Sequence, residues 1–471
     1  MRLCDITDSD EKVEIKGITA DSREVKQGFL FGSLNDDAYI DDAIAKGAAA
    51  VIVGEESKFH QAAGVVVVRT KSPQTVYAQA VAKYYGAVPQ HLAAITGTNG
   101  KTSIADFTRQ MLVGLHKSAA SIGTLGIIEN NAAPVVLPNT TPNNVTLHRA
   151  LSKLYSDGVE YAILEASSHG LVQGRLDGVE FEAAGFTNLT RDHLDYHKTF
   201  DNYFKAKLLL FERRLKSGGT AVLNADIEHY AALCEVCRQR GCQIVSYGYG
   251  GRELKLLKSR NYGNGQVLEV EYFGRKQEIV VGLAGEFQAM NVLCAIGLTA
   301  ALSGEAEAVL AQAEKIKGAK GRLEWVGNTH RGAAVYIDYA HTPDALENVL
   351  KALRGHTKNR LMVVFGCGGN RDKGKRPLMG KIANDLADAV YVTDDNPRFE
   401  DAAEIRREIM AACPKGVNIA GRGEAIREAM ATAEAGDVLV LAGKGHESGQ
   451  YINGEVIEFS DHDEARKYTG D

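Results

Sequence analysis

The sequence has 471 residues, 45% of them hydrophobic and 24% charged, which is the composition of an ordinary globular protein with room for about three domains. Its net charge of -6 argues against broad binding to nucleic acid or to an anionic membrane surface. No signal-peptide pattern opens the chain and no apolar run approaches about 18 residues, so we expect a cytoplasmic protein without a membrane span.

Residues 1–88 are predicted to form a small α/β domain. Short apolar runs predict strands at 14–18, 28–32, 49–53 and 65–68. Segments with helical spacing lie at 38–47 and 73–85. Pro89 then breaks the chain and marks a suitable linker.

The stretch 96–103, Thr-Gly-Thr-Asn-Gly-Lys-Thr-Ser, has the pattern of a phosphate-binding loop between a strand and a helix. Gly97 and Gly100 let backbone N–H groups close around anionic oxygens, because a side chain at either position would obstruct them. Lys101 is placed to reach the outer phosphates, and the Thr102 hydroxyl is placed to hold Mg²⁺.

This loop departs from the usual pattern at one position. Ile95 stands where the first glycine of the motif is expected. A plain strand–helix turn whose Lys101 faces solvent is therefore the alternative interpretation. The run of Thr, Asn and Gly that ends in Lys-Thr-Ser at a helix start favours nucleotide binding.

Residues 89–321 are predicted to form a central domain in which strands and helices alternate, as a parallel sheet requires. The pattern predicts buried strands at 161–164 and 183–186, an amphipathic helix at 201–216 and a further helix at 286–303. A period of two at 268–272 and 277–281 predicts a β-hairpin appended to this sheet.

Polar groups follow the predicted strands of the central domain, where open α/β sheets place their ligands. Glu165 is a natural second ligand for Mg²⁺, or else a cap for the next turn. The loop 187–197 is rich in ionisable groups, and His193 could ligate a metal unless this is a surface loop capped by Asp192. By its spacing alone, Lys207 would be a solvated lysine on a helix face.

Residues 322–471 are predicted to form a second doubly wound, Rossmann-like unit. Its strands are expected at 335–337, 361–365, 389–392 and 438–441. Polar or glycine-rich stretches end these strands at 338–344, 366–376, 394–398 and 443–447. Their mixed charges would suit a zwitterion that carries ammonium and carboxylate groups, with a surface ion-pair network as the alternative.

The seven cysteines are widely spaced, which fits reduced thiols in a reducing compartment. Cys234 and Cys237 have the spacing of half a zinc site, but no second pair follows them. We interpret them as ordinary apolar residues.

Taken in order, these stretches resemble the motifs of the Mur ligase family of ATP-dependent peptidoglycan precursor ligases over nearly the whole chain. The motifs that carry the resemblance are 96–103, 165–170, 192–193, 338–343 and 443–447. The resemblance implies three α/β domains. These are a small N-terminal unit (1–88), a central P-loop ATPase with a mostly parallel sheet and a β-hairpin appendage (89–321), and a C-terminal Rossmann-like domain (322–471).

Within the family, the chain is most similar to the branch that adds the third residue of the stem peptide. The discriminating pieces are 139–142, Ser167 with Gln173 and Arg175, and 395–398. The resemblance implies an ATP-dependent ligase, which joins UDP-N-acetylmuramoyl-L-alanyl-D-glutamate to meso-2,6-diaminopimelate through an acyl phosphate. The alternatives are an L-lysine-adding or folylpolyglutamate synthetase-like ligase of the same superfamily and a non-catalytic nucleotide switch.

The resemblance also implies roles for individual residues. ATP would be bound by Gly97, Thr98, Asn99, Gly100, Lys101, Thr102, Ser103, Asn291, Arg322 and Asp338. The expected catalytic residues are Lys101, Glu165, His193 and Lys207. Thr102 and Glu165 would hold one Mg²⁺, and His193 would hold a second together with a Lys207 carbamylated by CO₂.

Two further sets belong to the other substrates. The UDP-substrate would be bound by Ser22, Asn139, Thr140, Thr141, Ser167, Gln173 and Arg175. Diaminopimelate would be bound by Arg371, Asp395, Asn396, Pro397, Arg398, Gly443 and Glu447. We expect a monomer whose partners are these small molecules, with no nucleic acid.

Two positions depart from the family pattern. Gln288 replaces the first asparagine of an Asn-x-x-Asn pair near the adenine. The loop 32–37 is shorter than usual, which leaves the second uridine contact unassigned.

Overall fold

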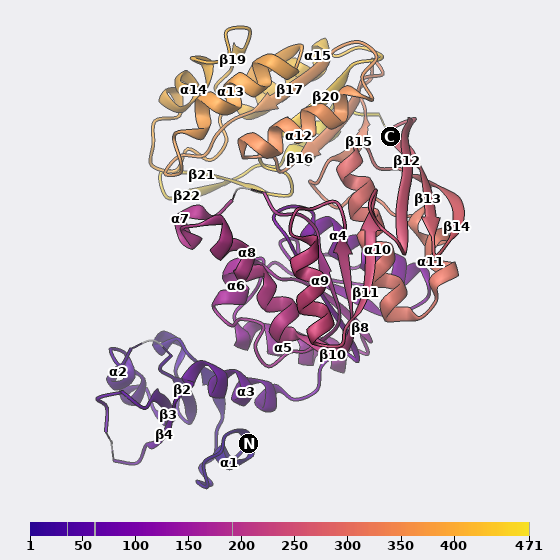
Figure 1. Ribbon diagram of the computed structural model, residues 1–471. Coiled ribbons are helices and arrows are strands. Elements are labelled where there is room, and N and C mark those ends of the chain that lie inside the picture. The colour runs from indigo at the N-terminus through magenta and orange to yellow at the C-terminus, as the bar shows by residue number, and fades with distance from the viewer. Residues whose placement is uncertain (35, 61–62, 191, 471) are drawn as a thin grey trace. The chain divides into compact units, whose positions relative to one another are not determined.

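The computed structural model describes residues 1–34, 36–60, 63–190 and 192–470 (Figure 1). The chain divides into two compact units, Met1–Val245 with Gly297–Ala306 and Ser246–Ile296 with Glu307–Asp471. Asn35 of the loop 32–37 and Arg191 of the loop 187–197 lie outside the described residues.

The chain begins with a four-stranded parallel sheet in the order β1-β2-β3-β4. The strands are β1 (Gly17–Thr19), β2 (Phe29–Gly32), β3 (Ala48–Gly54) and β4 (Val66–Thr70). The helices are α1 (Leu3–Ile6), η1 (Ser22–Glu24), α2 (Ile40–Ala45) and α3 (Pro73–Tyr85). Alternate residues face opposite sides: Ala50 packs with α1 and α3, whereas Val51 packs with α2.

The first strand is shorter than predicted. Residues 14–16, expected to open it, lie outside β1 because this segment pairs with the start of the chain instead. Arg2 forms an antiparallel bridge with Glu14, and the Ile15 N–H donates to the Met1 carbonyl at 2.7 Å.

The first unit also holds a sheet whose strands run in the order β10-β9-β5-β8-β6-β7. All its neighbours are parallel except β6 and β7. The strands are β5 (His91–Thr96), β6 (Ala119–Gly123), β7 (Gly126–Glu129), β8 (Tyr161–Glu165), β9 (Phe181–Phe186) and β10 (Leu215–Asn224). The helices are α4 (Lys101–Gly114), α5 (Asn144–Ser156), α6 (Ser168–Val172), α7 (Leu194–His197), α8 (Phe200–Leu209), η2 (Leu210–Arg214) and α9 (Tyr230–Gln239).

The helix predicted at 201–216 is wrong at its carboxyl end. The α-helix α8 stops at Leu209, residues 210–214 form the π-helical turn η2, and β10 starts at Leu215. The reason is tertiary: Leu215 is fully buried and is paired in register with Phe181 of β9. Sheet pairing thus overrides the helical periodicity.

In the second unit, β13 and β14 form the predicted antiparallel hairpin, which confirms the change of period seen in the sequence. The elements here are β12 (Leu254–Tyr262), β13 (Gly265–Tyr272), β14 (Arg275–Val281) and α11 (Ala306–Ala313), which begins at the last residue of the first unit. The strand β11 (Gln243–Gly248) and the helix α10 (Glu286–Ser303) span the boundary between the units. The strand β12, which was not predicted, pairs with the other side of β13.

Among the described residues, α10 is the one helix whose length and hydropathy reach those of a membrane span. Its 18 residues have a mean hydropathy of 1.2, and 67% of them are buried within the protein. A helix that is apolar all round and mostly buried is equally what the core of a globular protein contains. The feature is therefore weak evidence for a membrane span.

The last sheet of the second unit has the order β15-β16-β20-β17-β18-β19. The strands are β15 (Glu324–Asn328), β16 (Ala334–Asp338), β17 (Leu361–Phe365), β18 (Ala389–Val392), β19 (Val417–Asn418) and β20 (Val438–Ala442). The helices are α12 (Pro343–Arg354), α13 (Lys375–Leu386), α14 (Ala402–Met410), α15 (Arg422–Thr432) and α16 (Asp461–Arg466), with a separate hairpin of β21 (Gly449–Ile452) and β22 (Glu455–Glu458). The four predicted strands are the parallel centre of this sheet, which confirms the Rossmann-like interpretation.

Helices cover both faces of this sheet (Figure 1). In β17, Val363 packs with residues of α12, α13 and α14, whereas the next residue, Val364, packs with α15 and α16. Because both faces are buried, the polar residues of this domain must gather at the ends of the strands.

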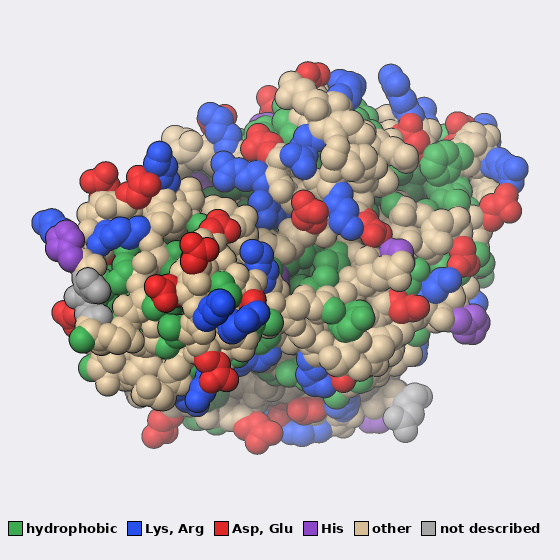
Figure 2. All heavy atoms as spheres, turned by 90° about the horizontal axis from the view of Figure 1, so that it is seen from below, with side chains coloured by type: hydrophobic (Ala, Val, Ile, Leu, Met, Phe, Trp, Pro, Cys, Tyr) green, Lys and Arg blue, Asp and Glu red, His purple; other side chains and the backbone are tan. Residues whose placement is uncertain are grey.

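The charged side chains on the face drawn in Figure 2 are interspersed, with Lys and Arg beside Asp and Glu. A polyanion such as nucleic acid is bound by a broad basic surface. The mixed pattern on this face is instead typical of a protein whose cationic sites are local.

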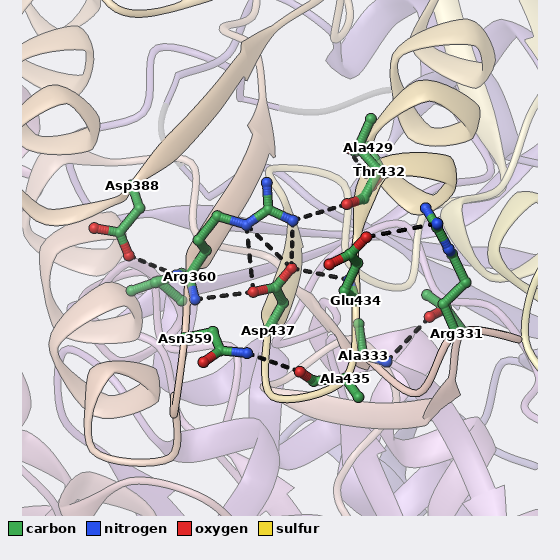
Figure 3. Close-up of polar contacts among 12 residues, drawn as sticks. Arg331, Ala333, Asn359, Arg360, Asp388, Ala429, Thr432, Glu434, Ala435 and Asp437 are labelled. Atoms are coloured by element: carbon green, nitrogen blue, oxygen red, sulfur yellow. Dashed lines mark hydrogen bonds and ion pairs between the residues drawn. The ribbon is translucent and has the colours of Figure 1, made fainter.

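The amino ends of the central strands are closed by an ion-pair network (Figure 3). Arg360 directly precedes β17, and Asp437 directly precedes β20. The Asp437 side chain is 1% exposed and accepts a hydrogen bond from Arg360 Nη2 at 2.6 Å. Burial raises the pKa of Asp437, but the hydrogen bonds from Arg360 outweigh it and hold that pKa below its ordinary value. This end of the sheet is structural.

Candidate active site

The phosphate loop links β5 to α4 in the predicted place. Gly97 and Gly100 have φ of 145° and 88°, which favour glycine, and a Cβ on Gly97 would overlap the Thr187 hydroxyl. The Lys101 ammonium donates to the carbonyls of Gly97 at 2.9 Å and of Thr98 at 2.7 Å. The loop is therefore a closed turn with its lysine folded over it.

The segment that follows β9 fixes the other side of this loop. The backbone N–H of Thr98 donates to the Asn188 carbonyl at 2.9 Å, and that of Asn99 donates to Asn188 Oδ1 at 2.9 Å. The Thr187 hydroxyl donates to the Asn99 carbonyl at 2.6 Å. These contacts make the loop rigid before any ligand arrives, as anion-binding loops require.

A buried carboxylate stands at the start of α4. Glu165 is the last residue of β8 and is 3% exposed, and its Oε2 accepts a hydrogen bond from the Thr102 hydroxyl at 2.9 Å. Thr124 adds a backbone N–H to Oε1 at 2.7 Å. Gly123 makes room for this carboxylate, because a Cβ there would overlap Glu165 Oε1. One hydroxyl and one carboxylate beside a phosphate loop are the oxygen donors that Mg²⁺ prefers.

Lys207 lies on the same loop, contrary to the solvated position that its spacing predicts. It is 1% exposed, its Nζ donates to the Gly97 carbonyl at 2.7 Å, and it lies 4.3 Å from the centre of the Tyr203 ring. Burial first, and then the charge of Lys101, hold the pKa of Lys207 well below its ordinary value, although Asp192 acts in the opposite direction. A lysine of this kind is set up for chemistry on its amine.

His193 is linked to the phosphate loop by way of the Tyr203 ring. It has φ of 52° and lies 3.3 Å from the Asp192 carboxylate. Its ring centre is 6.2 Å from that of Tyr203, whose hydroxyl is 3.2 Å from the Thr98 hydroxyl. The four residues expected to be catalytic, Lys101, Glu165, His193 and Lys207, are thus gathered around one loop.

The residues expected to bind the UDP-substrate peptide lie next to Glu165. The Thr141 hydroxyl donates to the Glu165 carbonyl at 2.7 Å, and the Arg175 guanidinium donates to the Thr141 carbonyl at 2.7 Å. Arg175 Nε also donates to Gln173 at 2.9 Å. Ser167 caps α6, and its backbone N–H donates to Thr141 at 3.0 Å.

Three other residues are expected to bind the UDP-substrate: Thr140, Asn139 and Ser22. The Thr140 hydroxyl lies 3.0 Å from the Thr124 hydroxyl. Asn139 is exposed directly before it. Ser22 opens the short helix η1, which connects β1 to β2, and its carbonyl accepts a hydrogen bond from Lys46 at 3.1 Å.

In the second unit, the residues expected near adenine and ribose form one chain of contacts. Gln288 accepts a hydrogen bond from Asn291 at 2.9 Å and donates to the Arg322 carbonyl at 3.1 Å. The Arg322 guanidinium lies 4.7 Å from the Tyr339 ring centre. Gln288, which replaces the first asparagine of the family pattern, therefore links Asn291 to the backbone of Arg322.

Asp338 ends β16 and accepts backbone N–H groups from Leu323 at 2.6 Å and Ala340 at 2.7 Å. Burial raises the pKa of Asp338 to about 6, although Arg322 and the two N–H groups act against it. A buried carboxylate held in this way can accept hydrogen bonds from a sugar hydroxyl.

The residues expected to bind diaminopimelate meet at the carboxyl edge of the last sheet. The Gly369 N–H donates to the Asn396 carbonyl at 2.9 Å, and Arg398 Nη1 donates back to the Gly369 carbonyl at 2.9 Å. A Cβ on Gly369 would overlap the Pro397 carbonyl, and one on Gly443 would press on the Asp395 carboxylate.

Glu447 joins this group through Asn396, whose Nδ2 donates to Glu447 Oε2 at 3.0 Å. Arg371 lies at the exposed end of the glycine-rich loop, where its guanidinium donates to the Asn370 carbonyl at 3.2 Å. Arg371 is thus an exposed member of the expected set, bonded to its neighbour in the loop.

Sequence reasoning missed several residues of these clusters. Thr124 was missed because the strand that precedes it, β6, was not predicted from its short run of small residues. Tyr203 was considered only as a neighbour of Lys207. Its position in the sequence, shortly after the histidine-containing loop 187–197, could have indicated that its ring packs against that loop. Lys444 lies inside a quoted motif, but a lysine between glycines gives no sign that it is buried.

Cys234 and Cys237 belong to α9 and are buried in the apolar core of the central sheet. Both are free thiols, and among the described residues no group of three or more His, Cys, Asp and Glu side chains is arranged to hold a metal ion. Their surroundings are those of core side chains.

Family models match two parts of the chain. The Mur ligase middle domain matches residues 95–299, and the Mur ligase glutamate ligase domain matches residues 321–445. The chain is 46% identical over 459 residues to the UDP-N-acetylmuramoyl-L-alanyl-D-glutamate–2,6-diaminopimelate ligase of Agrobacterium fabrum, covering 96% of this chain and 93% of that one. It is 47% identical over 463 residues to the ligase of the same name from Rhizobium meliloti, covering 97% and 95%.

A solved structure of a UDP-N-acetylmuramoyl-L-alanyl-D-glutamate–2,6-diaminopimelate ligase is also similar. It has 33% sequence identity and a TM-score of 0.71, and the match covers 98% of this chain and 96% of that one. The likeness therefore extends over nearly the whole chain rather than to the phosphate loop alone.

Proposed function

The chain belongs to the Mur ligase family, and on that basis we propose that it joins UDP-N-acetylmuramoyl-L-alanyl-D-glutamate to meso-2,6-diaminopimelate with hydrolysis of ATP. The support is the full-length similarity to ligases of that name, together with two clusters of side chains. One cluster surrounds the phosphate loop, and the other contains Arg398 and Glu447. The reaction belongs to cytoplasmic peptidoglycan precursor synthesis, and the protein acts as a monomer of three domains, 1–88, 89–321 and 322–471.

The observation that carries this proposal is the contact between Thr102 and Glu165 at the start of α4, 2.9 Å long and buried beside the phosphate loop. Its donors fit Mg²⁺, which would be held there with ATP and would neutralise charge on the phosphates during transfer. Lys101 and the loop N–H groups hold the phosphates in line. Positioning and charge neutralisation are most of what phosphoryl transfer needs.

The acid substrate is proposed to bind through Thr140, Thr141 and Arg175. This places its free glutamate carboxylate near Glu165 and the transferred phosphoryl group. The carboxylate oxygen attacks the γ-phosphorus and the bond to the ADP oxygen breaks, which leaves an acyl phosphate. The amine of diaminopimelate then attacks the acyl carbon, phosphate leaves with the bonding electrons, and the amine loses a proton.

We further propose that Lys207 carries a CO₂-derived carbamate that, with His193, would hold a second Mg²⁺. The support is local. Lys207 is buried, and among the described residues its amine donates to the neutral carbonyl of Gly97 rather than to a carboxylate. A buried lysine that kept its charge would ordinarily need an acidic partner. A neutral lysine amine attacks CO₂ at carbon and loses one proton, which gives an anionic ligand of the kind that a divalent cation prefers.

Selection of the amino acid is proposed to depend on Arg398. Its guanidinium lies beside Gly369 at the carboxyl edge of the sheet and can pair with the second carboxylate of diaminopimelate. L-Lysine has no such carboxylate, so this contact discriminates between the two amino acids.

The decisive experiment offers the protein meso-diaminopimelate, L-lysine and L-glutamate in parallel, with ATP, Mg²⁺ and the UDP-substrate, and measures ADP formation. We expect ADP formation that depends on diaminopimelate. Preference for L-lysine or L-glutamate would reassign the amino acid. ADP formation that needs no amino acid would contradict the ligase proposal and favour a nucleotide switch.

A further inference from the structure

Lys444 is a fully buried lysine between two of the proposed substrate-binding residues. Its side chain is 0% exposed, and it follows Gly443 in the turn that ends β20. Its ammonium donates to Asn396 Oδ1 at 3.3 Å, to Glu447 Oε2 at 3.1 Å and to the Gly449 carbonyl at 2.6 Å. An ammonium has three donors, and here each has an acceptor.

These contacts fix the orientation of Asn396. Its Oδ1 accepts from Lys444 and from the Tyr451 N–H at 3.1 Å, and its Nδ2 donates to Glu447 Oε2 at 3.0 Å. A lysine ammonium and a backbone N–H can only donate, so the oxygen of the amide must face them. The amide is thereby held with its nitrogen toward Glu447.

The carboxylate of Glu447 is held on one side only. Both Lys444 and Asn396 donate to Oε2, and among the described residues no hydrogen bond reaches Oε1. The Glu447 side chain is 28% exposed, whereas that of Lys444 is not exposed at all. One oxygen is therefore anchored, and the other is available to a ligand.

Lys444 also joins the hairpin β21–β22 to the segment 395–398. The Gly449 carbonyl that it binds belongs to the first residue of β21. In the same hairpin, the Tyr451 carbonyl accepts from the Arg398 N–H at 2.8 Å, and the Asn453 N–H donates to the Arg398 carbonyl at 2.6 Å. These bonds hold Arg398 at φ of 54°, an uncommon conformation for a residue other than glycine.

We propose that Lys444 is a positioning residue for amino-acid selection. Its buried ammonium fixes Oε2 of Glu447 and Oδ1 of Asn396, so that Oε1 of Glu447 is presented to an ammonium group of the incoming diamino acid. Its positive charge balances that of Glu447, so that this carboxylate does not cancel the charge of Arg398, which can then pair with a second substrate carboxylate. This inference rests on the proposed function.

Loss of the Lys444 charge should shift the site toward cationic amino acids. Without it, Glu447 is an uncompensated anion, which favours L-lysine over diaminopimelate, whose distal ammonium and carboxylate cancel. We expect Lys444→Met to raise the KM for diaminopimelate about tenfold or more and to lower the ratio of kcat/KM for diaminopimelate over L-lysine. The KM for ATP should stay within about twofold of that of the unmodified protein, because Lys444, Asn396 and Glu447 are not among the proposed ATP-binding residues.

The test measures KM and kcat for each substrate in Lys444→Met, Lys444→Gln and Lys444→Arg, with the unfolding temperature of each. Lys381→Met is the matched control, since Lys381 is 68% exposed and pairs with Asp385 on α13 of the same unit. Lys444→Gln keeps a donor but removes the charge, so it reports on charge even if the methionine variant fails to fold. Lys444→Arg should restore part of the selectivity.

A double-mutant cycle with Glu447→Gln separates positioning from a general structural role. If Lys444 acts through Glu447, Lys444→Gln should have little further effect on the KM for diaminopimelate in that background. Full additivity, or a rise in the KM for ATP equal to that for diaminopimelate, would overturn the inference. The unmodified protein is assayed first: no turnover with any diamino acid would refute the proposed function, whereas normal turnover with unaltered selectivity in the variants would refute this inference alone.

Discussion

Thr124 holds the carboxylate of Glu165 by both oxygens. Its backbone N–H donates to Oε1 at 2.7 Å, and its hydroxyl donates to Oε2 at 3.2 Å. The same hydroxyl lies 3.0 Å from that of Thr140, which is proposed to contact the UDP-substrate. One threonine thus connects the proposed Mg²⁺ ligand to the proposed acid-substrate residues.

Thr124→Val should weaken both sites together. Valine keeps the shape and the backbone N–H but removes the hydroxyl, so we expect kcat/KM for the UDP-substrate to fall about tenfold, which corresponds to about 1.4 kcal/mol. The Mg²⁺ concentration at half-maximal rate should rise as well. Thr124→Ser, which keeps the hydroxyl, is the control. Equal behaviour of the two variants would show that the hydroxyl is dispensable.

Lys207→Ala should abolish turnover if the carbamate is required. Short carboxylic acids such as acetate should restore part of the rate by supplying the missing anion. Lys205→Ala on the same helix is the matched control, because Lys205 is 67% exposed and pairs with Asp201. A ¹³C signal from ¹³CO₂ bound to the protein, present in the control and lost with Lys207, would be independent of activity. Unchanged turnover in Lys207→Ala would contradict the proposal.

Arg398→Ala should raise the KM for diaminopimelate far more than that for ATP. A charge-assisted hydrogen bond is worth about 1.5–3 kcal/mol, or roughly a 10- to 150-fold change. Arg407→Ala provides a comparison, since Arg407 is 76% exposed on α14. Steady-state kinetics with both substrates distinguish the outcomes. Equal effects on the two KM values would refute the assignment of Arg398 to selectivity.

ATP binding should weaken in mild acid because burial raises the pKa of Asp338 to about 6. Below that pH the carboxylate is protonated and loses acceptor capacity, so the KM for ATP should rise by up to tenfold per pH unit. Because the pKa of Asp338 is higher in the folded protein than in the unfolded chain, ionisation of Asp338 opposes folding. The free energy of unfolding should therefore fall as the pH rises from about 4 to about 6. Asp338→Asn should flatten the profile of KM against pH. A profile identical to that of the unmodified protein would contradict this prediction.

Asp437→Asn should destabilise the last domain without changing the kinetics. The change removes charge-assisted hydrogen bonds from Arg360, so we expect a loss of about 1.5–3 kcal/mol in urea unfolding. The pKa of Asp437 lies below its ordinary value, so this stability is present above that value and is lost as the pH falls through the lowered pKa. Arg331→Ala, in an exposed pair with Glu434, should cost much less. Loss of turnover in the folded Asp437 variant would argue against a purely structural role.

The sequence was enough to predict what depends on local patterns. The phosphate loop, the hairpin of β13 and β14 and the four central strands of the last sheet all follow from periodicity and turn residues over short windows. Pro343 at the first turn of α12 is a similar case, because its backbone suits that position.

What the sequence could not predict depends on partners distant in the chain. Lys207 is buried because it bonds to Gly97, which is 110 residues away, and no window around position 207 contains that information. Lys444 bonds to Asn396, 48 residues away. The predicted carboxyl end of the helix at 201–216 was wrong for the same reason, because Leu215 pairs with Phe181 of a neighbouring strand in the sheet.

In the last domain, the proposed ligand-binding residues and the ion-pair network lie at opposite ends of the strands of one sheet. Asp338 and Gly443 lie at the carboxyl ends of β16 and β20, whereas Arg360 and Asp437 lie just before the amino ends of β17 and β20. Substitutions meant to change the stability of this domain but not its turnover are therefore best placed at the amino ends of the strands, one strand length from the proposed ligand-binding residues.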